Sequence, residues 1–167
     1  PLIKQAMNQG YEVIEFILGR PCEPADENLL KNKLNILPNF KTVDLALDFL
    51  QENVPMLAHL TRLQLREFLL DSQILVPKTG SLIFARDEFS TEVYNIVQGN
   101  VLIEIDKNNP KKTVSVNASN FFGEISLISG RRRSATVRAG KPCVLVQTPR
   151  RSMLKLMQSV DAVRKII

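Results

Sequence analysis

The chain has 167 residues, of which 44% are hydrophobic and 23% charged, and its formal net charge is +5. This composition is typical of a globular protein, and the length suits one ordinary domain with its own core plus an extension. No apolar run approaches the roughly 20 residues that span a bilayer, and no signal peptide is visible, so we expect a cytoplasmic location and no membrane partner. Only Cys22 and Cys143 are present, which argues against a disulfide framework or a zinc site.

The first third of the sequence predicts helices. Residues 2–19 read as one amphipathic helix that ends at Gly19, and a linker follows over 21–26. Two shorter helices are expected over 26–34 and 42–52. We therefore assign residues 1–53 to a helical extension or linker.

A further helix over 61–70 has its apolar residues at helical spacing, and Thr61 is placed to cap it. The one histidine, His59, lies just before this helix and is interpreted as a structural polar residue. No nucleophile–base pair and no metal cluster can be assembled from the sequence. We expect no catalytic residues, no metal and no enzyme activity in this chain.

Residues 73–149 contain short β-rich runs separated by turn signals, which is typical of an all-β roll or barrel. The runs lie at 74–76, 82–84, 93–97, 101–105, 113–116, 135–139 and 143–148. Apolar and polar residues alternate over 101–105, as expected for a strand with one buried face. Pro149 then precedes a helix over 150–158, and a last helix begins at Asp161.

The segment 121–137 is the most informative part of the chain. Phe121 and Phe122 predict a buried strand that ends at Gly123, where the backbone must come close to a neighbour. Residues 125–128 are long enough for one helical turn, whose free N–H groups would attract an anion. Arg133 can grip two phosphate oxygens with its planar guanidinium.

Ser134 adds a hydroxyl and a backbone N–H to this group of donors. Glu124 would repel a phosphate, so we expect it to accept hydrogen bonds from hydroxyls beside the phosphate. A surface carboxylate is the alternative interpretation. Together these residue types describe a pocket for a ribose phosphate.

Other interpretations of this segment are weaker. A nucleotide-triphosphate P-loop requires Lys and then Ser or Thr after its second glycine, whereas Arg131 and Arg132 follow Gly130 here. We expect these two arginines to be solvated surface residues.

Residues 122–137 resemble the phosphate-binding cassette of the cyclic nucleotide-binding domain family, which includes the protein kinase A regulatory subunits and the catabolite activator protein. The matching positions are Phe122-Gly123-Glu124-Ile125-Ser126-Leu127 and Arg133-Ser134-Ala135-Thr136-Val137. The resemblance implies that Glu124 holds the ribose 2′-OH, that Arg133 pairs with the cyclic phosphate and that Ser134 contributes donors. The residues implied to shape the loop are Gly123, Ile125, Ser126 and Ala135.

The resemblance also implies a fold. The family's domain is mainly β with flanking helices (α+β): an eight-stranded antiparallel β-roll of jelly-roll type, with the cassette between its sixth and seventh strands. It would cover residues 54–167. Where the family commonly has Gly-Asp, this chain has Asp87-Glu88. Because aspartate tolerates the left-handed region better than most residues, we expect the turn to survive.

In the family the last helix swings over the pocket when nucleotide binds. That helix is still running at Ile167, so we expect a fragment whose output domain lies elsewhere in a longer protein. The leading function is therefore a regulatory module for a 3′,5′-cyclic nucleotide, with cAMP ahead of cGMP. The nucleotide would be a ligand, and no cofactor is expected in this chain.

Two other function classes remain. The first helix, with Ala6 and Gly10 in an Ala-x-x-x-Gly pattern, weakly resembles the last helix of thioredoxin reductase-type flavoproteins. This resemblance allows a β-roll interaction module that binds no nucleotide and is attached to a flavin- or NAD(P)-dependent oxidoreductase; an ordinary packing helix is its alternative. A DNA-binding regulator lacks sequence support, because no helix-turn-helix segment follows the roll in this sequence, although one could lie beyond Ile167. No nucleic acid partner is expected.

Overall fold

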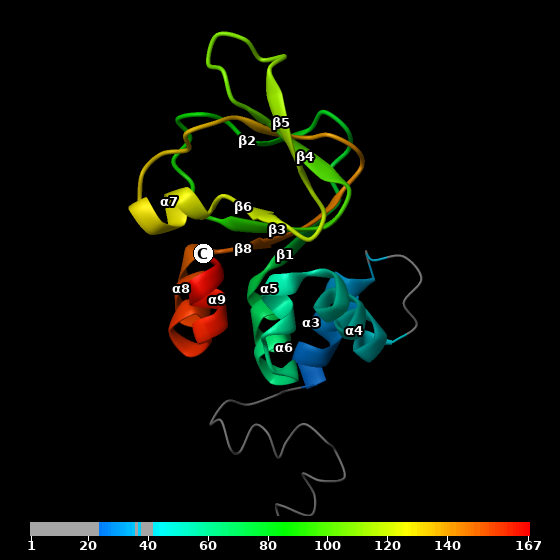
Figure 1. Cartoon of the computed structure of the whole chain (residues 1–167). Helices are drawn as coiled ribbons and strands as arrows, with labels where there is room; N and C mark the ends of the chain where they lie inside the picture. The colour runs from blue at the N-terminus through cyan, green and yellow to red at the C-terminus, as the bar shows by residue number, and fades with distance from the viewer. Residues whose placement is uncertain (1–23, 36, 38–41) are drawn as a thin grey trace, which may run out of the picture.

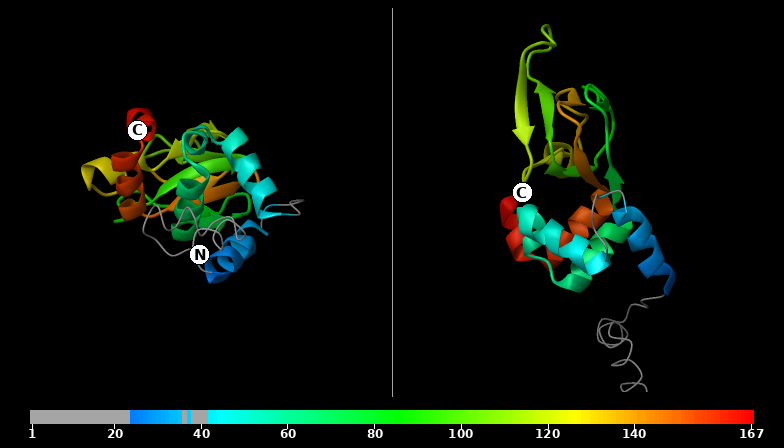
Figure 2. Two further views of the ribbon diagram at one scale, coloured as in Figure 1. Left: turned by 90° about the horizontal axis from the view of Figure 1, so that it is seen from below. Right: turned by 90° about the vertical axis from the view of Figure 1, so that its right-hand side faces the viewer.

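A computed structural model of the chain describes residues 24–35, 37 and 42–167. The described part has two layers, a β-roll and a group of helices that covers one side of it, as Figures 1 and 2 show. The helix predicted over residues 2–19 lies outside the described residues. Among those described, no helix combines the length and the apolar character that a bilayer-spanning segment requires.

The helices before the roll are α3 (Pro24–Leu34), α4 (Val43–Asn53), α5 (Pro55–Ala58) and α6 (Arg62–Asp71). The helices predicted over 26–34, 42–52 and 61–70 are thus confirmed to within two residues. Thr61 and Gln64 form a capping box in which each side chain bonds the other's backbone N–H, at 3.1 and 2.9 Å. This reciprocal cap explains why α6 begins where it does.

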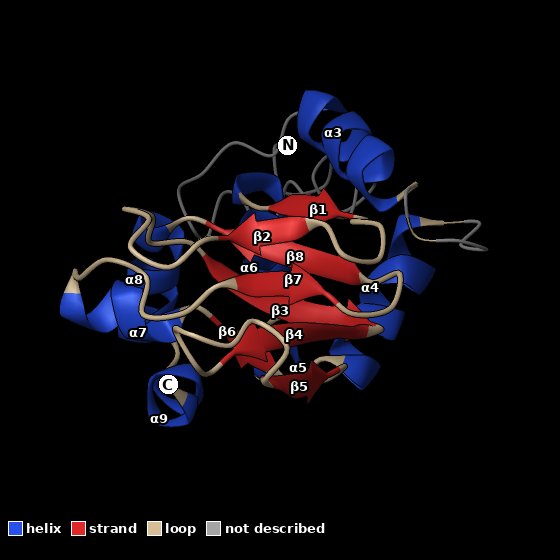
Figure 3. Ribbon diagram, turned by 90° about the horizontal axis from the view of Figure 1, so that it is seen from above, coloured by secondary structure: helices blue, strands red, loops and turns tan. Residues whose placement is uncertain are grey.

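The eight strands of the roll form two four-stranded antiparallel sheets, ordered β1-β8-β3-β6 and β2-β7-β4-β5. Figure 3 shows the strands of the two sheets lying over one another. Their bounds are β1 Gln73–Leu75, β2 Leu82–Phe84, β3 Val93–Gln98, β4 Asn100–Glu104, β5 Thr113–Asn117, β6 Phe121–Phe122, β7 Val137–Ala139 and β8 Val144–Thr148. The predicted eight-stranded antiparallel roll is confirmed.

One strand is shorter than its sequence indicates. A strand was expected over 135–139, but β7 begins only at Val137. The Thr136 hydroxyl instead accepts a hydrogen bond from the Arg86 backbone N–H at 3.0 Å. Ala135 and Thr136 are therefore part of the turn that leaves the cassette.

The central strand β3 is buried on both faces, which is why its sequence shows no alternation of apolar and polar residues. Val93 and Val97 pack into the cluster shared with the helices. Tyr94 and Ile96 face the interior of the roll. There the rings of Tyr94 and Phe122 stack 4.9 Å apart, and Phe84 lies 5.9 Å from each.

The helical layer is built from both ends of the described chain. After the roll come α8 (Arg150–Ser159) and α9 (Asp161–Ile166), and Met153 and Val163 are fully buried in the same cluster as Leu30 and Leu47 of the preceding helices. Lys33 of α3 also donates to the carbonyls of Leu69, Leu70 and Ser72 at 2.6–3.2 Å. The helices α3 and α4 thus share one hydrophobic cluster with strands of the roll.

Candidate functional site

The cassette consists of a strand, a short helix and a turn, and a glycine lies at each end of the helix. The strand β6 leads to Gly123 at φ 90°, α7 runs over Glu124–Ser129, and Gly130 follows at φ 66°. Both φ values lie in the left-handed region that favours glycine. A Cβ on Gly123 would lie 2.8 Å from the Glu92 carbonyl oxygen and 3.0 Å from Arg133 Nη1. The close backbone approach predicted at Gly123 is confirmed.

A pocket of about 250 Å³ lies where the cassette meets the interior of the roll. Its apolar lining includes Phe84, Ile103 and Val137. All seven residues that sequence reasoning selected also line it: Gly123, Glu124, Ile125, Ser126, Arg133, Ser134 and Ala135. The fold therefore brings both ends of the cassette to one cavity.

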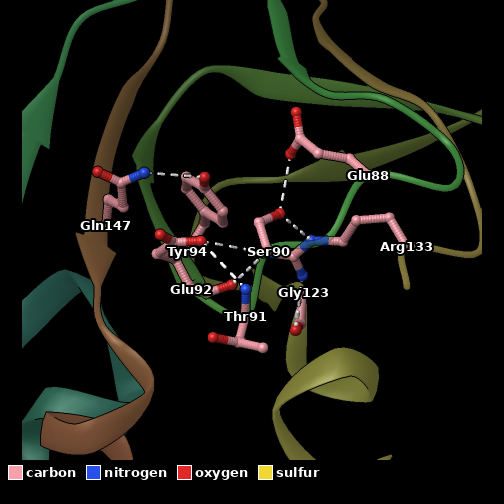
Figure 4. Close-up of polar contacts among 8 residues, drawn as sticks. All are labelled: Glu88, Ser90, Thr91, Glu92, Tyr94, Gly123, Arg133 and Gln147. Atoms are coloured by element: carbon pink, nitrogen blue, oxygen red, sulfur yellow. Dashed lines mark hydrogen bonds and ion pairs between the residues drawn. The ribbon is translucent and has the colours of Figure 1, made fainter. Parts of the chain in front are cut away.

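Arg133 is the most tightly held side chain of this pocket and is only 2% exposed. Its Nε donates to Ser90 Oγ at 2.9 Å, Nη1 to the Gly123 carbonyl at 3.0 Å and Nη2 to the Glu92 carbonyl at 2.8 Å. Figure 4 shows these contacts. The guanidinium also lies 4.0 Å from the centre of the Phe84 ring, a cation–π contact. These contacts give the buried cation a defined orientation.

Burial lowers the pKa of Arg133, and the phenol of Tyr94 and the carboxylates of Glu92, Glu88 and Glu124 oppose that shift. The Glu92 carboxylate lies 3.7 Å from Nη2. Because an arginine guanidinium is not deprotonated in proteins, the group keeps its charge. The pocket therefore contains a desolvated cation, and such a cation attracts an anion more strongly than one in water does.

Glu124 is the first residue of α7 and is half-buried at the pocket. Its carboxylate makes no hydrogen bond or ion pair with the described residues, so both of its oxygens can accept from a hydroxyl. Ser126 is buried, whereas Ile125 is 61% exposed. Ser134 is exposed at the other end of the pocket.

Sequence reasoning missed the loop between β2 and β3, residues 85–92. The Asp87 N–H donates to the Arg133 carbonyl at 2.8 Å, and the Arg133 N–H donates to the Glu88 carbonyl at 2.9 Å. Ser90 and Glu92 of the same loop hold the guanidinium. The expectation that Asp87 tolerates a left-handed turn is confirmed by its φ of 69°. The unusual Asp87-Glu88 pair was the only sequence signal here, and it did not point to Arg133.

The neighbouring arginines are placed differently. Arg131 and Arg132 are exposed and neither lines the pocket, as expected for surface residues. Arg132 nevertheless donates to the Asp87 carbonyl at 3.1 Å and lies 5.6 Å from the centre of the Phe89 ring. No group of three or more potential metal ligands occurs among the described residues.

Comparisons with known proteins agree with this geometry. The family model described as "Cyclic nucleotide-binding domain" matches residues 76–160, about half of the chain, including the whole cassette. A putative potassium channel protein of Rhodopseudomonas palustris is 33% identical over 86 residues, which is 52% of this chain and 21% of that protein. The cAMP-dependent protein kinase regulatory subunit of Schizosaccharomyces pombe is 31% identical over 90 residues, or 54% and 21%. The matched region thus spans about a fifth of these relatives.

Solved structures share the fold. The regulatory domain of Toxoplasma gondii PKA, crystallised with cAMP, superposes with a TM-score of 0.61 at 24% identity, over 73% of this chain and 48% of that one. The catabolite activator protein of Thermus thermophilus gives 0.56 at 23% identity, over 66% and 53%. With this fold, and with a family model that matches the roll and its cassette, the chain belongs to the cyclic nucleotide-binding domain family.

Proposed function

We propose that this chain binds a 3′,5′-cyclic nucleotide in the pocket between α7 and the roll, and that it binds cAMP more tightly than cGMP. The observation that carries the proposal is the pocket itself, which is lined by a buried arginine and by a carboxylate with no hydrogen-bond or ion-pair partner among the described residues. Arg133 would pair with the cyclic phosphate, Glu124 would accept the ribose 2′-OH, and Ser134 would donate to the phosphate. Gly123, Ile125, Ser126 and Ala135 would shape the loop.

The hydrogen bonds of Arg133 to described residues use three of its N–H donors and leave two for a ligand. A guanidinium carries five N–H donors, and three of them bond to Ser90, Gly123 and Glu92. Since Nε has a single hydrogen, the two remaining donors lie on Nη1 and Nη2. Two donors on one planar group match two oxygens of a phosphate diester.

The small volume of the pocket supports a binding mode in which only part of the nucleotide lies inside it. Its volume of about 250 Å³ is below the roughly 300–1,000 Å³ of typical small-molecule sites. We therefore place the ribose and the cyclic phosphate inside and the base at the mouth, near the exposed side chain of Ile125. The preference for cAMP is supported by two of the relatives, the Schizosaccharomyces pombe regulatory subunit and the Toxoplasma gondii regulatory domain, whose names specify cAMP.

We further propose that binding regulates an attached partner through the C-terminal helices. Residues 138–167 are all described, and none of them lines the pocket. In this arrangement Val163 of α9 is buried in the helical layer. A ligand that binds better when the last helix covers the pocket would shift the population toward that closed state.

A path from the cassette to these helices exists. Arg150, the first residue of α8, donates from Nε to the Leu127 carbonyl of α7 at 3.2 Å. The Leu127 side chain is fully buried in the helical layer. A shift of α7 on ligand binding would therefore be transmitted to α8 through the Arg150–Leu127 hydrogen bond and through the packing of the Leu127 side chain.

Domains of this family act as regulators and do not catalyse reactions, so we assign this chain no enzymatic role. The output domain is proposed to lie elsewhere in a longer protein. The relatives named as a potassium channel and as a kinase regulatory subunit show two kinds of protein that carry such a domain. The cytoplasmic location stays a prediction.

Calorimetric titration of the chain with cAMP, cGMP and 5′-AMP tests the proposal. We expect saturable binding of the cyclic nucleotides, tighter for cAMP, and much weaker binding of the linear monophosphate. Binding of none of the three would overturn the proposal and would favour the interaction module that binds no nucleotide. Equal affinity for cAMP and cGMP would remove only the stated preference.

A further inference from the structure

A short polar chain lies behind the pocket arginine. Arg133 Nε donates to Ser90 Oγ at 2.9 Å, and the Ser90 hydroxyl donates its proton to Glu88 Oε2 at 2.8 Å. Figure 4 shows the Ser90 side chain between those of Arg133 and Glu88. Because a serine hydroxyl has one hydrogen, its donation to Glu88 leaves the oxygen lone pairs turned toward Arg133.

Ser90 differs from the other groups that hold the guanidinium. The acceptors of Nη1 and Nη2 are the backbone carbonyls of Gly123 and Glu92, whereas the acceptor of Nε is the side chain of Ser90. Nε is the atom of the planar guanidinium that is bonded to the aliphatic part of the side chain. A fixed Nε therefore limits rotation of the plane, and so decides where the two remaining N–H groups point.

We infer that Ser90 is a positioning residue for Arg133 and that Glu88 supports it by accepting a hydrogen bond from the Ser90 hydroxyl. This inference rests on the proposed function, since it concerns how the same arginine meets a cyclic phosphate. Without the Ser90 hydroxyl the guanidinium keeps its charge, its two carbonyl partners and the Phe84 contact, but Nε loses the hydrogen bond that helps to fix the plane. Loss of the hydroxyl should therefore weaken phosphate binding and change which phosphate oxygen is preferred. It should hardly change the stability of the fold.

Ser90→Ala tests this, with Thr91→Ala as the matched control. Both residues are half-buried in the same loop, and each substitution removes one hydroxyl. The Thr91 hydroxyl points away from Arg133 in Figure 4. For each variant the affinities for cAMP and for the Sp and Rp phosphorothioates of cAMP are measured by competition, together with the midpoint of thermal unfolding.

We expect Ser90→Ala to weaken cAMP binding about tenfold, the scale of a hydrogen bond to a charged group. The ratio of the Sp and Rp affinities should move toward one, because a guanidinium whose Nε is no longer fixed distinguishes less between the two phosphate oxygens. Thr91→Ala should leave both quantities as in the parent. In a chain that already carries Arg133→Ala, Ser90→Ala should cause no further loss.

Several outcomes would overturn the inference. An unchanged affinity in Ser90→Ala would show that the two carbonyls are sufficient to orient Arg133. A lower affinity with an unchanged Sp/Rp ratio, or an equal loss in the Arg133→Ala background, would show that Ser90 supports the loop generally. If the parent chain binds no cyclic nucleotide, the proposed function itself fails, and this inference fails with it.

Discussion

The two ends of the cassette contribute to the pocket in different ways. At the arginine end, the β2–β3 loop bonds both the backbone and the side chain of Arg133, which is 2% exposed. At the glutamate end, Glu124 has no hydrogen-bond partner among the described residues. Its helix neighbours Ile125 and Ile128 are 61% and 60% exposed. The guanidinium of Arg133 is thus fixed in orientation by the fold, whereas no hydrogen bond to a described residue fixes the carboxylate of Glu124.

Arg133→Ala should have the largest effect on binding. Removal of a charged, oriented partner of a phosphate is expected to cost at least about 2–3 kcal/mol, or some tens-fold to a hundredfold in affinity. Titration calorimetry with cAMP measures this. Arg131→Ala and Arg132→Ala are the controls and should change the affinity far less. Parent-like binding by Arg133→Ala would contradict the assignment.

Gly123→Ala and Gly130→Ala form a matched pair at the two ends of α7. Both glycines have positive φ, so alanine is strained at either site, by about 1–2 kcal/mol. Only at Gly123 would the added Cβ also meet the Glu92 carbonyl and Arg133, because nothing lies within 4 Å of a Cβ at Gly130.

We therefore expect Gly123→Ala to lower the free energy of unfolding more than Gly130→Ala does, and to disturb the arginine site. Urea denaturation and nucleotide titration measure the two effects. Equal losses in both variants would mean that backbone strain is the whole effect, and that the close approach at Gly123 does not matter.

Glu124→Gln tests the other end of the cassette. If Glu124 accepts from the ribose 2′-OH, loss of its charge should weaken cAMP about fivefold to tenfold and hardly change the affinity for 2′-deoxy-cAMP. A competition assay with cAMP and 2′-deoxy-cAMP distinguishes a contact with the ribose 2′-OH from a general support of the loop. The same loss for both ligands would show that Glu124 supports the loop and does not read the sugar.

The smallest effect on affinity is expected for Arg150→Ala, which removes the donor to the Leu127 carbonyl at the junction of α7 and α8. Because Arg150 is exposed, solvent weakens this hydrogen bond of a charged donor, and we expect it to contribute about 1 kcal/mol. The informative measurement is hydrogen exchange over residues 150–166 with and without cAMP. We expect the parent to show a ligand-dependent change there and the variant to show a smaller one. An identical response would exclude this contact from the path.

Much of the fold could be predicted because its signals are local. Apolar alternation over 101–105, the turn residues between strands and Thr61 before its helix all act within a few positions along the chain. The start of β7 could not be predicted, because the hydrogen bond that holds Thr136 in a turn comes from Arg86, in a distant part of the sequence. The packing of α3 and α4 into one cluster with the roll could not be predicted for the same reason, because an apolar helix face fits many partners.

The sequence by itself determined the cassette. Two glycines, a carboxylate and an arginine at set spacing are local requirements of backbone conformation and charge, and the structure places all seven selected residues at one pocket. Only the tertiary structure decided what holds the arginine. Glu88, Ser90 and Glu92 lie far from Arg133 in the chain, and they surround it because β2 pairs with β7 while β3 pairs with β6. A buried cation needs such partners, and which side chains supply them depends on strand pairing, which no local pattern records.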